Sequence, residues 1–377
     1  MVDGKRVASG LEVSAFRLAR HHLAGKVPAE PSAICHDVCG IQAQVMSAAE
    51  IALWARNHEL TRPAIHSSLR ESRTLVKTAL MRGTLHLVAA RDFPLYIAAL
   101  RTSRVRQALQ IMARYGVSEN DARAVGEAVI EMLRGGPMTR KDLTKQVLAL
   151  GIAGKKARPW FEQSSWGVFR LPMTEGLVCY GPSRGQEVAL VRTDQWLGGQ
   201  KQVGEQEAVR ILIRRYLSAY GPADSRDFSK WSGLPASEVR PIWHSLDKDF
   251  IVVDIPGMRG FMLREDAKAL GNRDPECGVL RLLPSFDAYM LGHSEKQHLV
   301  EARHYKRVFR DQWWISPAIL LDGRVIGTWA TARGKKNTVF TAEPFEKLSK
   351  SKRARIEAEV ASLARFLQTP YEIKLKA

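Results

Sequence analysis

The sequence predicts an α+β protein: three tandem winged-helix motifs followed by a small C-terminal β domain with a capping helix. Three segments repeat one order of elements, which is helix, turn, helix and then a short hairpin with glycine near its tip. From Gly278 onward the chain changes to short β-rich runs and ends in one long helical pattern. Helix–turn–helix followed by a hairpin is the winged-helix arrangement, in which the second helix lies along a DNA groove.

The clearest copy of this repeat lies at residues 205–264. Its first helix has apolar residues at helical spacing and stops at Tyr220-Gly221-Pro222, which terminates a helix. A short helix is expected near residues 227–231, and Pro235 then fits the first turn of the next helix. Two β-rich runs flank Pro256-Gly257 and predict a hairpin over residues 250–263.

The other two copies share this pattern rather than residues. The second spans about 119–193: Thr139 caps a helix after Gly136-Pro137, and a wing is expected over 177–191 with its tip at 181–185. The remaining copy uses 64–71 as a helix and 75–88 as a hairpin around Arg82-Gly83. These copies predict four parts, namely residues 1–115 with the first winged helix, 116–200 with the second, 201–275 with the third, and 276–377 as the β domain and helix.

The pattern of the C-terminal part predicts a β-sheet capped by a helix. Short β-rich runs lie at 279–283, 314–321, 325–332 and 338–341, with Asp322-Gly323 as a strong hairpin turn. A second turn is expected at Gly334-Lys335-Lys336-Asn337. Apolar residues recur on one face over 344–367, so we expect one long amphipathic helix there.

Composition limits the function classes. The chain has 377 residues, 45% of them hydrophobic and 25% charged, which is ordinary for two or three packed domains. No run approaches the roughly 18 apolar residues of a membrane span, the N-terminus lacks a signal-peptide core, and four cysteines cannot form a disulfide scaffold. These absences leave a soluble intracellular protein, and we expect a cytoplasmic monomer with no membrane partner.

The net charge of +18 is the most informative number. About half of this excess falls in roughly the last 80 residues. Any single basic run is more often a solvated helix face than a binding site. The balance of the whole chain nevertheless favours a polyanionic partner, with nucleic acid first and an acidic membrane surface second.

Several familiar active-site motifs are absent from the sequence, including the phosphate-binding loop, the Gly-x-Ser-x-Gly elbow and His-Glu-x-x-His. Cys35-His36-Asp37-x-Cys39 suggests a metal site but has no second Cys or His pair at metal-finger spacing, so buried thiols are the favoured interpretation. His86 likewise fits a packed structural residue better than a base. We expect no metal and no cofactor.

Gln42 and Gln44 form the one pair of polar residues whose spacing suggests chemistry. Ser47 and Glu50 match a capping box, which predicts that a helix begins at Ala48, and Gly40 is expected to end the helix before it. If the intervening stretch is extended, side chains two residues apart share one side. The alternative is that both amides are only surface or capping residues at the N-terminus of a helix.

Two neutral amides suit one class of reaction. Each offers an acceptor and a donor without titrating, so together they can hold a water molecule and stabilise a developing positive charge. Loss of a cationic N7- or N3-alkylated purine from deoxyribose is such a reaction, because the leaving group departs easily and the sugar becomes oxocarbenium-like.

Three motifs in order carry a family resemblance. Gly40-Ile41-Gln42-Ala43-Gln44 resembles the Gln-hydrophobic-Gln motif of the winged-helix DNA glycosylases related to AlkZ. Two later segments are also similar to that family. They are residues 81–88, Met-Arg-Gly-Thr-Leu-His-Leu-Val, and residues 282–292, Leu-Leu-Pro-Ser-Phe-Asp-Ala-Tyr-Met-Leu-Gly. One departure follows, since His293-Ser294 stands where the family has an Asp-Arg pair.

The resemblance implies metal-independent, monofunctional removal of N-alkylated purines from double-stranded DNA, including the unhooking of interstrand crosslinks. It makes Gln42 and Gln44 the catalytic pair, and a glutamine rather than an acid at the second position separates the AlkZ-like branch from the YcaQ type. The basic residues expected to contact DNA lie at predicted hairpin tips and in glycine-bounded loops. They are Arg82, Lys155, Lys156, Arg158, Arg184, Arg259, Arg333, Lys335 and Lys336.

Two alternatives also fit the charge. A non-enzymatic winged-helix DNA-binding protein, such as a transcription factor or an architectural protein, explains the charge and the repeats but gives Gln42 and Gln44 no role. An RNA-binding module explains the charge alone, because the exposed aromatic stacking motifs of single-stranded RNA readers are absent.

Overall fold

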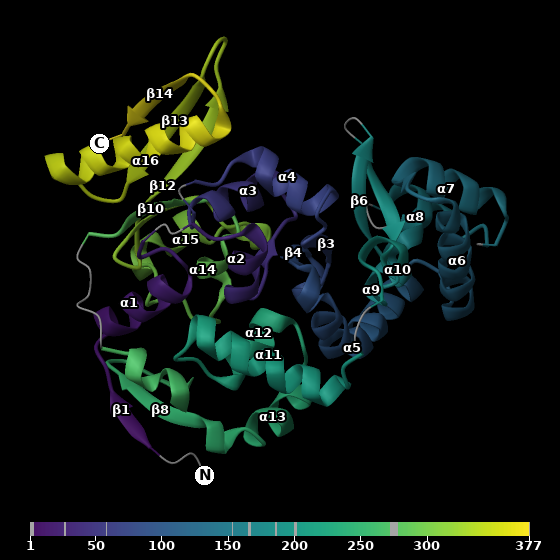
Figure 1. Ribbon diagram of the computed structural model, residues 1–377, viewed down its shortest axis with the longest axis horizontal. Coiled ribbons are helices and arrows are strands. Elements are labelled where there is room, and N and C mark those ends of the chain that lie inside the picture. The colour runs from purple at the N-terminus through teal and green to yellow at the C-terminus, as the bar shows by residue number, and fades with distance from the viewer. Residues whose placement is uncertain are drawn as a thin grey trace. The chain divides into compact units, whose positions relative to one another are not determined.

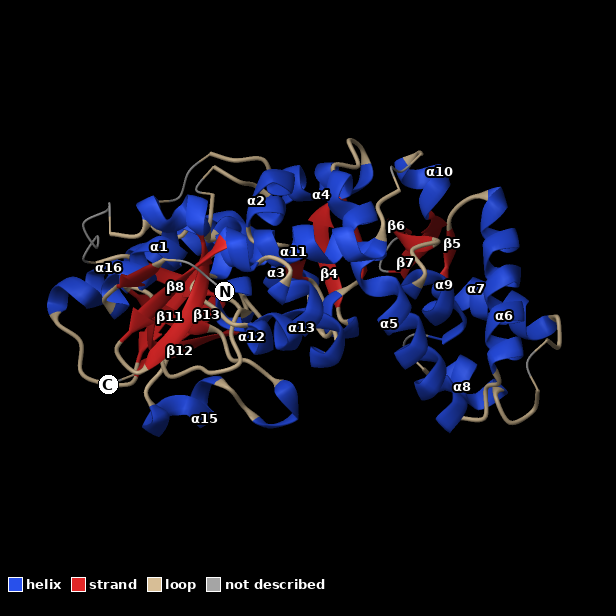
Figure 2. Cartoon of the chain, turned by 90° about the horizontal axis from the view of Figure 1, so that it is seen from below, coloured by secondary structure: helices blue, strands red, loops and turns tan. Residues whose placement is uncertain are grey.

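The computed structural model describes residues 4–25, 28–57, 59–152, 154–164, 167–184, 187–199, 202–271 and 278–376. Its contacts divide the chain into two compact units (Figure 1). The first unit comprises Met1–Ile65, Ile213–Trp231 and Ala236–Ala377, and the second comprises His66–Leu212 and Ser232–Pro235. Helices and strands are mixed throughout both units, which confirms the α+β class (Figure 2). The division into four parts remains a prediction.

A three-stranded sheet in the first unit contains the hairpin predicted at 250–263. Strands β8 (Phe250–Ile255) and β9 (Met258–Leu263) are antiparallel, as expected. The N-terminal strand β1 (Lys5–Val7) pairs in parallel with β8 and was not predicted, because three residues carry no periodic pattern. Val13 and Phe16 of α1 (Gly10–Arg20) pack against this sheet in one apolar cluster.

Three helices precede that hairpin, as the repeat predicts. They are α11 (Glu205–Tyr220), α12 (Ser225–Ser232) and α13 (Ala236–His244). The rings of Phe228, Trp243 and Phe250 join α12, α13 and β8, with centroids 6.5 Å and 5.2 Å apart. Arg17 of α1 donates to the backbone carbonyls of residues 220–222 at the end of α11, where a cation meets the negative end of the helix dipole.

The C-terminal part combines a β-sheet with a long helix, as expected (Figures 1 and 2). The sheet has five strands, one more than the sequence predicted. Its strands in order are β10 (Leu280–Leu283), β11 (Ala318–Leu321), β12 (Arg324–Arg333), β13 (Thr338–Pro344) and β14 (Tyr371–Leu375). The turn at Asp322-Gly323 has φ values of 49° and 84°, which confirms the Asp-Gly hairpin.

Two details of this part differ from the prediction. The helix α16 begins at Lys350, with Ser349 as its N-cap, and not near residue 344, because β13 continues to Pro344. Strand β14 follows α16 and pairs in parallel with β13. No local pattern predicts this pairing, because the two segments are distant in the sequence. Trp54 of α3 (Met46–Trp54) and Phe366 of α16 have ring centroids 6.2 Å apart, so the closing helix also packs on α3.

The second unit contains the hairpins of the first and second predicted copies. Strands β3 (Leu75–Ala79) and β4 (Leu85–Ala89) pair around Arg82-Gly83, and β6 (Val178–Arg184) pairs with β7 (Glu187–Arg192). Within this unit the strands lie in the order β4-β3-β6-β7-β5, with β5 at Met138–Thr139. Residues 181–184 were predicted as a turn but continue β6.

Helices surround this second sheet and share one apolar cluster with it. Thr139 caps α7 and accepts from the Asp142 backbone at 3.1 Å, as predicted. The helices of this unit are α5 (Phe93–Arg114), α6 (Glu119–Met132), α7 (Arg140–Ala149), α8 (Arg158–Gln163), α9 (Arg170–Thr174) and α10 (Thr193–Leu197).

The remaining short elements lie between these larger ones. They are α2 (Pro31–Asp37), β2 (Ile41–Gln42), α4 (Arg62–Arg70), α14 (Ala288–Leu291) and α15 (Tyr305–Val308). None of the helices in the described ranges is both long and apolar enough to span a membrane.

Four histidines in the interior make stability sensitive to acid. Burial and the charge of Arg82 lower the pKa of His86 to about 3, and burial and the charge of Arg17 lower that of His298 to about 2. Burial also holds the pKa values of His21 and His293 well below their usual range. All four side chains are therefore neutral in the folded protein.

We expect the free energy of unfolding to fall as the pH drops below about 6.5, because the unfolded chain then binds protons that the folded chain does not. Each histidine contributes up to about 1.4 kcal/mol per pH unit until its folded pKa is reached. Urea denaturation at pH 7.5 and pH 5 measures the loss. His86→Asn should reduce it, whereas His244→Asn should not, because the His244 side chain is 73% exposed. Equal losses in both variants and the wild type would contradict the assignment.

Candidate active site

The loop that carries Gln42 and Gln44 is set by the end of the preceding helix. Cys39 and Gly40 follow α2 with φ values of 57° and 91°, and the Gly40 N–H donates to the Cys35 carbonyl at 2.7 Å. This is a Schellman-type helix end, as the glycine predicts. The chain then enters β2 in an extended conformation.

Burial differs between the two amides. Ile41 and Ala43 have no exposed surface, so they hold this part of the chain in the core. Gln44 is exposed, whereas Gln42 keeps only 8% of its surface accessible. Because buried amides are held by hydrogen bonds, Gln42 is a positioned group and Gln44 is the one that meets solvent directly.

The predicted capping box next to this pair is wrong. Helix α3 begins at Met46 with Val45 as its N-cap, and no side chain caps it. Glu50 is buried and accepts from Arg62 Nε at 2.8 Å, so it is unavailable to Ser47. The Glu50 carboxylate therefore forms a tertiary ion pair with Arg62 and not the capping box that the local pattern predicted.

The Leu-Pro-Ser-Phe-Asp motif supports α3 from the far end of the sequence. Asp287 Oδ1 and Oδ2 each accept from one Arg56 guanidinium nitrogen at 2.8 Å, and both side chains are fully buried. Arg56 also donates to the Ala52 carbonyl of α3 at 2.7 Å. Asp287 therefore fixes the helix that follows the glutamine pair.

The departure after Gly292 combines a buried histidine with an exposed serine. His293 is 5% exposed and its ring centroid lies 4.7 Å from that of His298. The Ser294 backbone and hydroxyl both donate to Asp227 Oδ1, at 2.8 and 2.6 Å. These residues tie the loop to α12.

The second family-like segment forms the β3–β4 hairpin. Arg82 lies at its tip, half-buried, with φ at 54°. His86 is buried in β4, where its Nδ1 lies 2.9 Å from the Thr84 carbonyl and its Nε2 lies 3.5 Å from an Arg82 nitrogen. The depressed pKa of His86 and these contacts support the structural role favoured from sequence.

The thiols also match their favoured interpretation. Cys35, Cys39 and Cys179 are free and buried. Among the described residues no group of three His, Cys, Asp or Glu side chains could hold a metal ion.

Comparison with known proteins decides the family. Residues 36–366 match the family described as DNA glycosylase AlkZ-like. The chain belongs to the AlkZ-like DNA glycosylase family. It is 30% identical over 367 residues to the interstrand DNA cross-link repair glycosylase of Streptomyces sahachiroi, which covers 95% of this chain and 96% of that protein. The solved structure of Streptomyces sahachiroi DNA glycosylase AlkZ aligns with a TM-score of 0.85 at 28% identity, covering 98% of this chain and 100% of that one.

Membership of the AlkZ-like family confirms the resemblance that the three motifs predicted. It makes the chain an enzyme that acts on DNA, and it decides against the non-enzymatic DNA-binding protein and the RNA-binding module. The catalytic role of Gln42 and Gln44 remains a prediction.

The basic residues expected to contact DNA in this AlkZ-like chain are mostly exposed. In the first unit, Arg333, Lys335 and Lys336 lie exposed at the β12–β13 turn, and Arg259 is exposed on β9, 3.5 Å from Asp254 Oδ1. In the second unit, Lys155 and Lys156 are exposed before α8. The Arg184 side chain lies outside the described residues.

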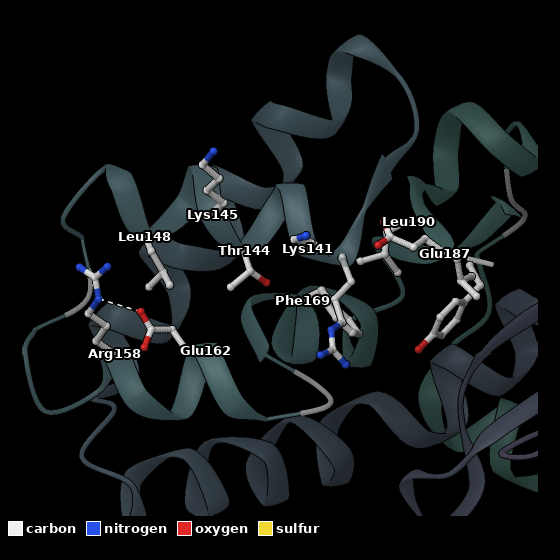
Figure 3. A pocket seen from close by; sticks show the side chains of 12 residues that line it. Lys141, Thr144, Lys145, Leu148, Arg158, Glu162, Phe169, Glu187 and Leu190 are labelled. Atoms are coloured by element: carbon white, nitrogen blue, oxygen red, sulfur yellow. Dashed lines mark hydrogen bonds and ion pairs between the residues drawn. The ribbon is translucent and has the colours of Figure 1, made fainter. Parts of the chain in front are cut away.

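Arg158 belongs to a basic pocket that sequence reasoning missed. It pairs with Glu162 at 2.9 Å and lines a pocket of about 720 Å³ beside Lys141 and Lys145 of α7 (Figure 3). Arg140 adds a fourth cation to this lining. The spacing of Lys141 and Lys145 puts them on one helix face, a pattern that would have found them.

Proposed function

We propose that this AlkZ-like enzyme hydrolyses the N-glycosidic bond of N7- and N3-alkylated purines in double-stranded DNA, with Gln42 and Gln44 as the catalytic pair. The observation that carries the proposal is the placement of the pair: Gln42 lies in β2 between the fully buried Ile41 and Ala43, and Gln44 faces solvent two residues later. Interstrand crosslinks are included, since the relative with 30% identity is named for their repair.

The chemistry requires positioning rather than a strong base. A water oxygen held by the amides attacks C1′ as the bond to the purine nitrogen breaks, and the bonding electron pair neutralises the cationic base. The amide carbonyl dipoles stabilise the positive charge that develops on the sugar. The proton of the attacking water passes to solvent because a glutamine cannot retain it. No step uses a metal or a covalent enzyme intermediate.

The proposal includes how the enzyme meets DNA. Exposed lysines and arginines on loops and hairpin turns suit contacts to the phosphate backbone, which give nearly sequence-independent, salt-dependent binding. That behaviour suits an enzyme that searches for lesions. We further propose that the protein acts as a monomer in the cytoplasm, associated with the nucleoid.

The wild-type protein is expected to release the alkylated base from duplex DNA that contains N7-methylguanine or an N7-linked interstrand crosslink. Strand breaks should appear only after alkali, because a monofunctional enzyme leaves an intact abasic site. Chromatography of the released base and denaturing gels measure both products. An unalkylated duplex is the control, and EDTA should leave the rate unchanged. Absence of base release from every alkylated duplex would contradict the proposal.

A further inference from the structure

The β3–β4 hairpin tip is shaped around an arginine from another helix. Gly83, in the 3-10 turn Met81–Gly83, has φ at 72° and donates to the Leu80 carbonyl at 2.9 Å. A Cβ on residue 83 would overlap the Arg104 guanidinium, whose Cζ would lie 2.7 Å away. Arg104 of α5 thus lies directly on the tip, next to Arg82, and Gly83 is required by this close approach as well as by its backbone angle.

Arg104 and its neighbours are held in place by their own contacts. Arg104 Nη1 donates to Gln107 Oε1 at 2.8 Å, one turn along α5. His86 keeps a proton on Nδ1 for the Thr84 carbonyl, which leaves Nε2 to face Arg82 as an acceptor. Two guanidinium groups are therefore oriented at one hairpin tip.

A third arginine, Arg170, lies on α9, which packs against both α5 and β3. Burial and the positive charges of Arg170 and Arg82 together lower the pKa of Arg104 to about 10. Burial likewise lowers the pKa of Arg170. All three arginines are half-buried, so they are partly shielded from water yet still reachable from solvent.

Like charges gathered from three elements favour an anion between them. Planar guanidinium groups match the oxygens of a phosphate, and partial burial strengthens that attraction. Because the family's substrate is DNA, the anion in reach is a backbone phosphodiester. We propose that Arg82, Arg104 and Arg170 form a preformed site for one backbone phosphate of DNA. This site rests on the DNA substrate of the family and not on the catalytic role of Gln42 and Gln44.

Affinity for an undamaged duplex, measured by fluorescence anisotropy over a range of salt concentrations, tests the site. Arg104→Gln should weaken binding at least tenfold at low salt and reduce the slope of log affinity against log salt by about one. Arg82→Gln should act in the same direction, and serves if Arg104→Gln fails to fold. Arg106→Gln is the matched control on an exposed face of α5 and should leave the slope unchanged.

A second measurement needs no DNA. Inorganic phosphate should raise the melting temperature of the wild type above that in sodium chloride of equal ionic strength, and should not do so for Arg104→Gln. An unchanged slope of log affinity against log salt in folded Arg104→Gln would overturn the proposal. It would do so even if phosphate still stabilises the wild type, because the site would then bind an anion other than DNA. Base release plays no part in either measurement, so a failure here is separate from a failure of the glutamine pair.

Discussion

Asp287→Ala is expected to lower the free energy of unfolding by about 3–5 kcal/mol. The variant leaves the Arg56 guanidinium fully buried without its counter-charge. In the wild type, burial acts to lower the pKa of Arg56, but Asp287 outweighs it and the pKa is raised. The same carboxylate accepts from the Tyr289 backbone at 2.9 Å, so its loss also uncaps α14. Urea denaturation followed by circular dichroism measures the change.

Two further variants test whether the loss comes from leaving Arg56 buried without a counter-charge. Asp254→Ala removes a similar carboxylate, 2.7 Å from Lys5 Nζ, whose side chain is 64% exposed, and should cost less than about 1 kcal/mol. The double variant Arg56→Met, Asp287→Leu should regain much of the stability, because apolar side chains need no counter-charge. A loss below about 1 kcal/mol in Asp287→Ala alone would show that the buried ion pair does not hold α3.

Gln44→Ala is expected to lower the single-turnover rate of base release by about 10²- to 10³-fold, the usual effect of removing one preorganised electrostatic group. Stability should change by no more than about 0.5 kcal/mol because Gln44 is exposed. Gln42→Ala should reduce the rate similarly, but at a cost of about 1 kcal/mol in stability, because Gln42 is nearly buried. Base release under excess enzyme and thermal melting measure the two effects.

Duplex affinity should remain at the wild-type value in both glutamine variants, since neither removes a charge. Gln110→Ala, an exposed glutamine on α5, is the matched control and should retain full activity. Gln44→Glu keeps an acceptor oxygen but loses the amide donor, so its residual rate separates the two functions of the side chain. Wild-type base release by the Gln42→Ala, Gln44→Ala double variant would refute the site.

The elements that could be predicted are those whose information is local. Helical spacing and the terminator at Tyr220-Gly221-Pro222 predicted α11, and Pro256-Gly257 and Asp322-Gly323 predicted their hairpins. The strands β1 and β14 could not be found, because each is a short edge strand defined by a partner distant in sequence.

The candidate site divides in the same way. Gln42 and Gln44 lie two residues apart, so a local pattern could single them out, and their common orientation stays a prediction. Arg104 and Arg170 have no sequence pattern that joins them to Arg82, because the hairpin tip, α5 and α9 meet only on folding. Glu50 was misassigned to a cap because its buried partner, Arg62, lies outside the local motif.

The sequence by itself determined the α+β class, the repeated helix and hairpin segments, the excess of positive charge and the family. Spacing, turn residues and motifs are local patterns, and net charge is a sum over the chain, so none of these depends on the fold. Tertiary structure alone decided that Gln42 is nearly buried while Gln44 is exposed, that Asp287 neutralises Arg56, and that Arg104 of α5 lies on the hairpin tip beside Arg82. Burial and charge pairing depend on which distant segments come together, and only the folded chain specifies that.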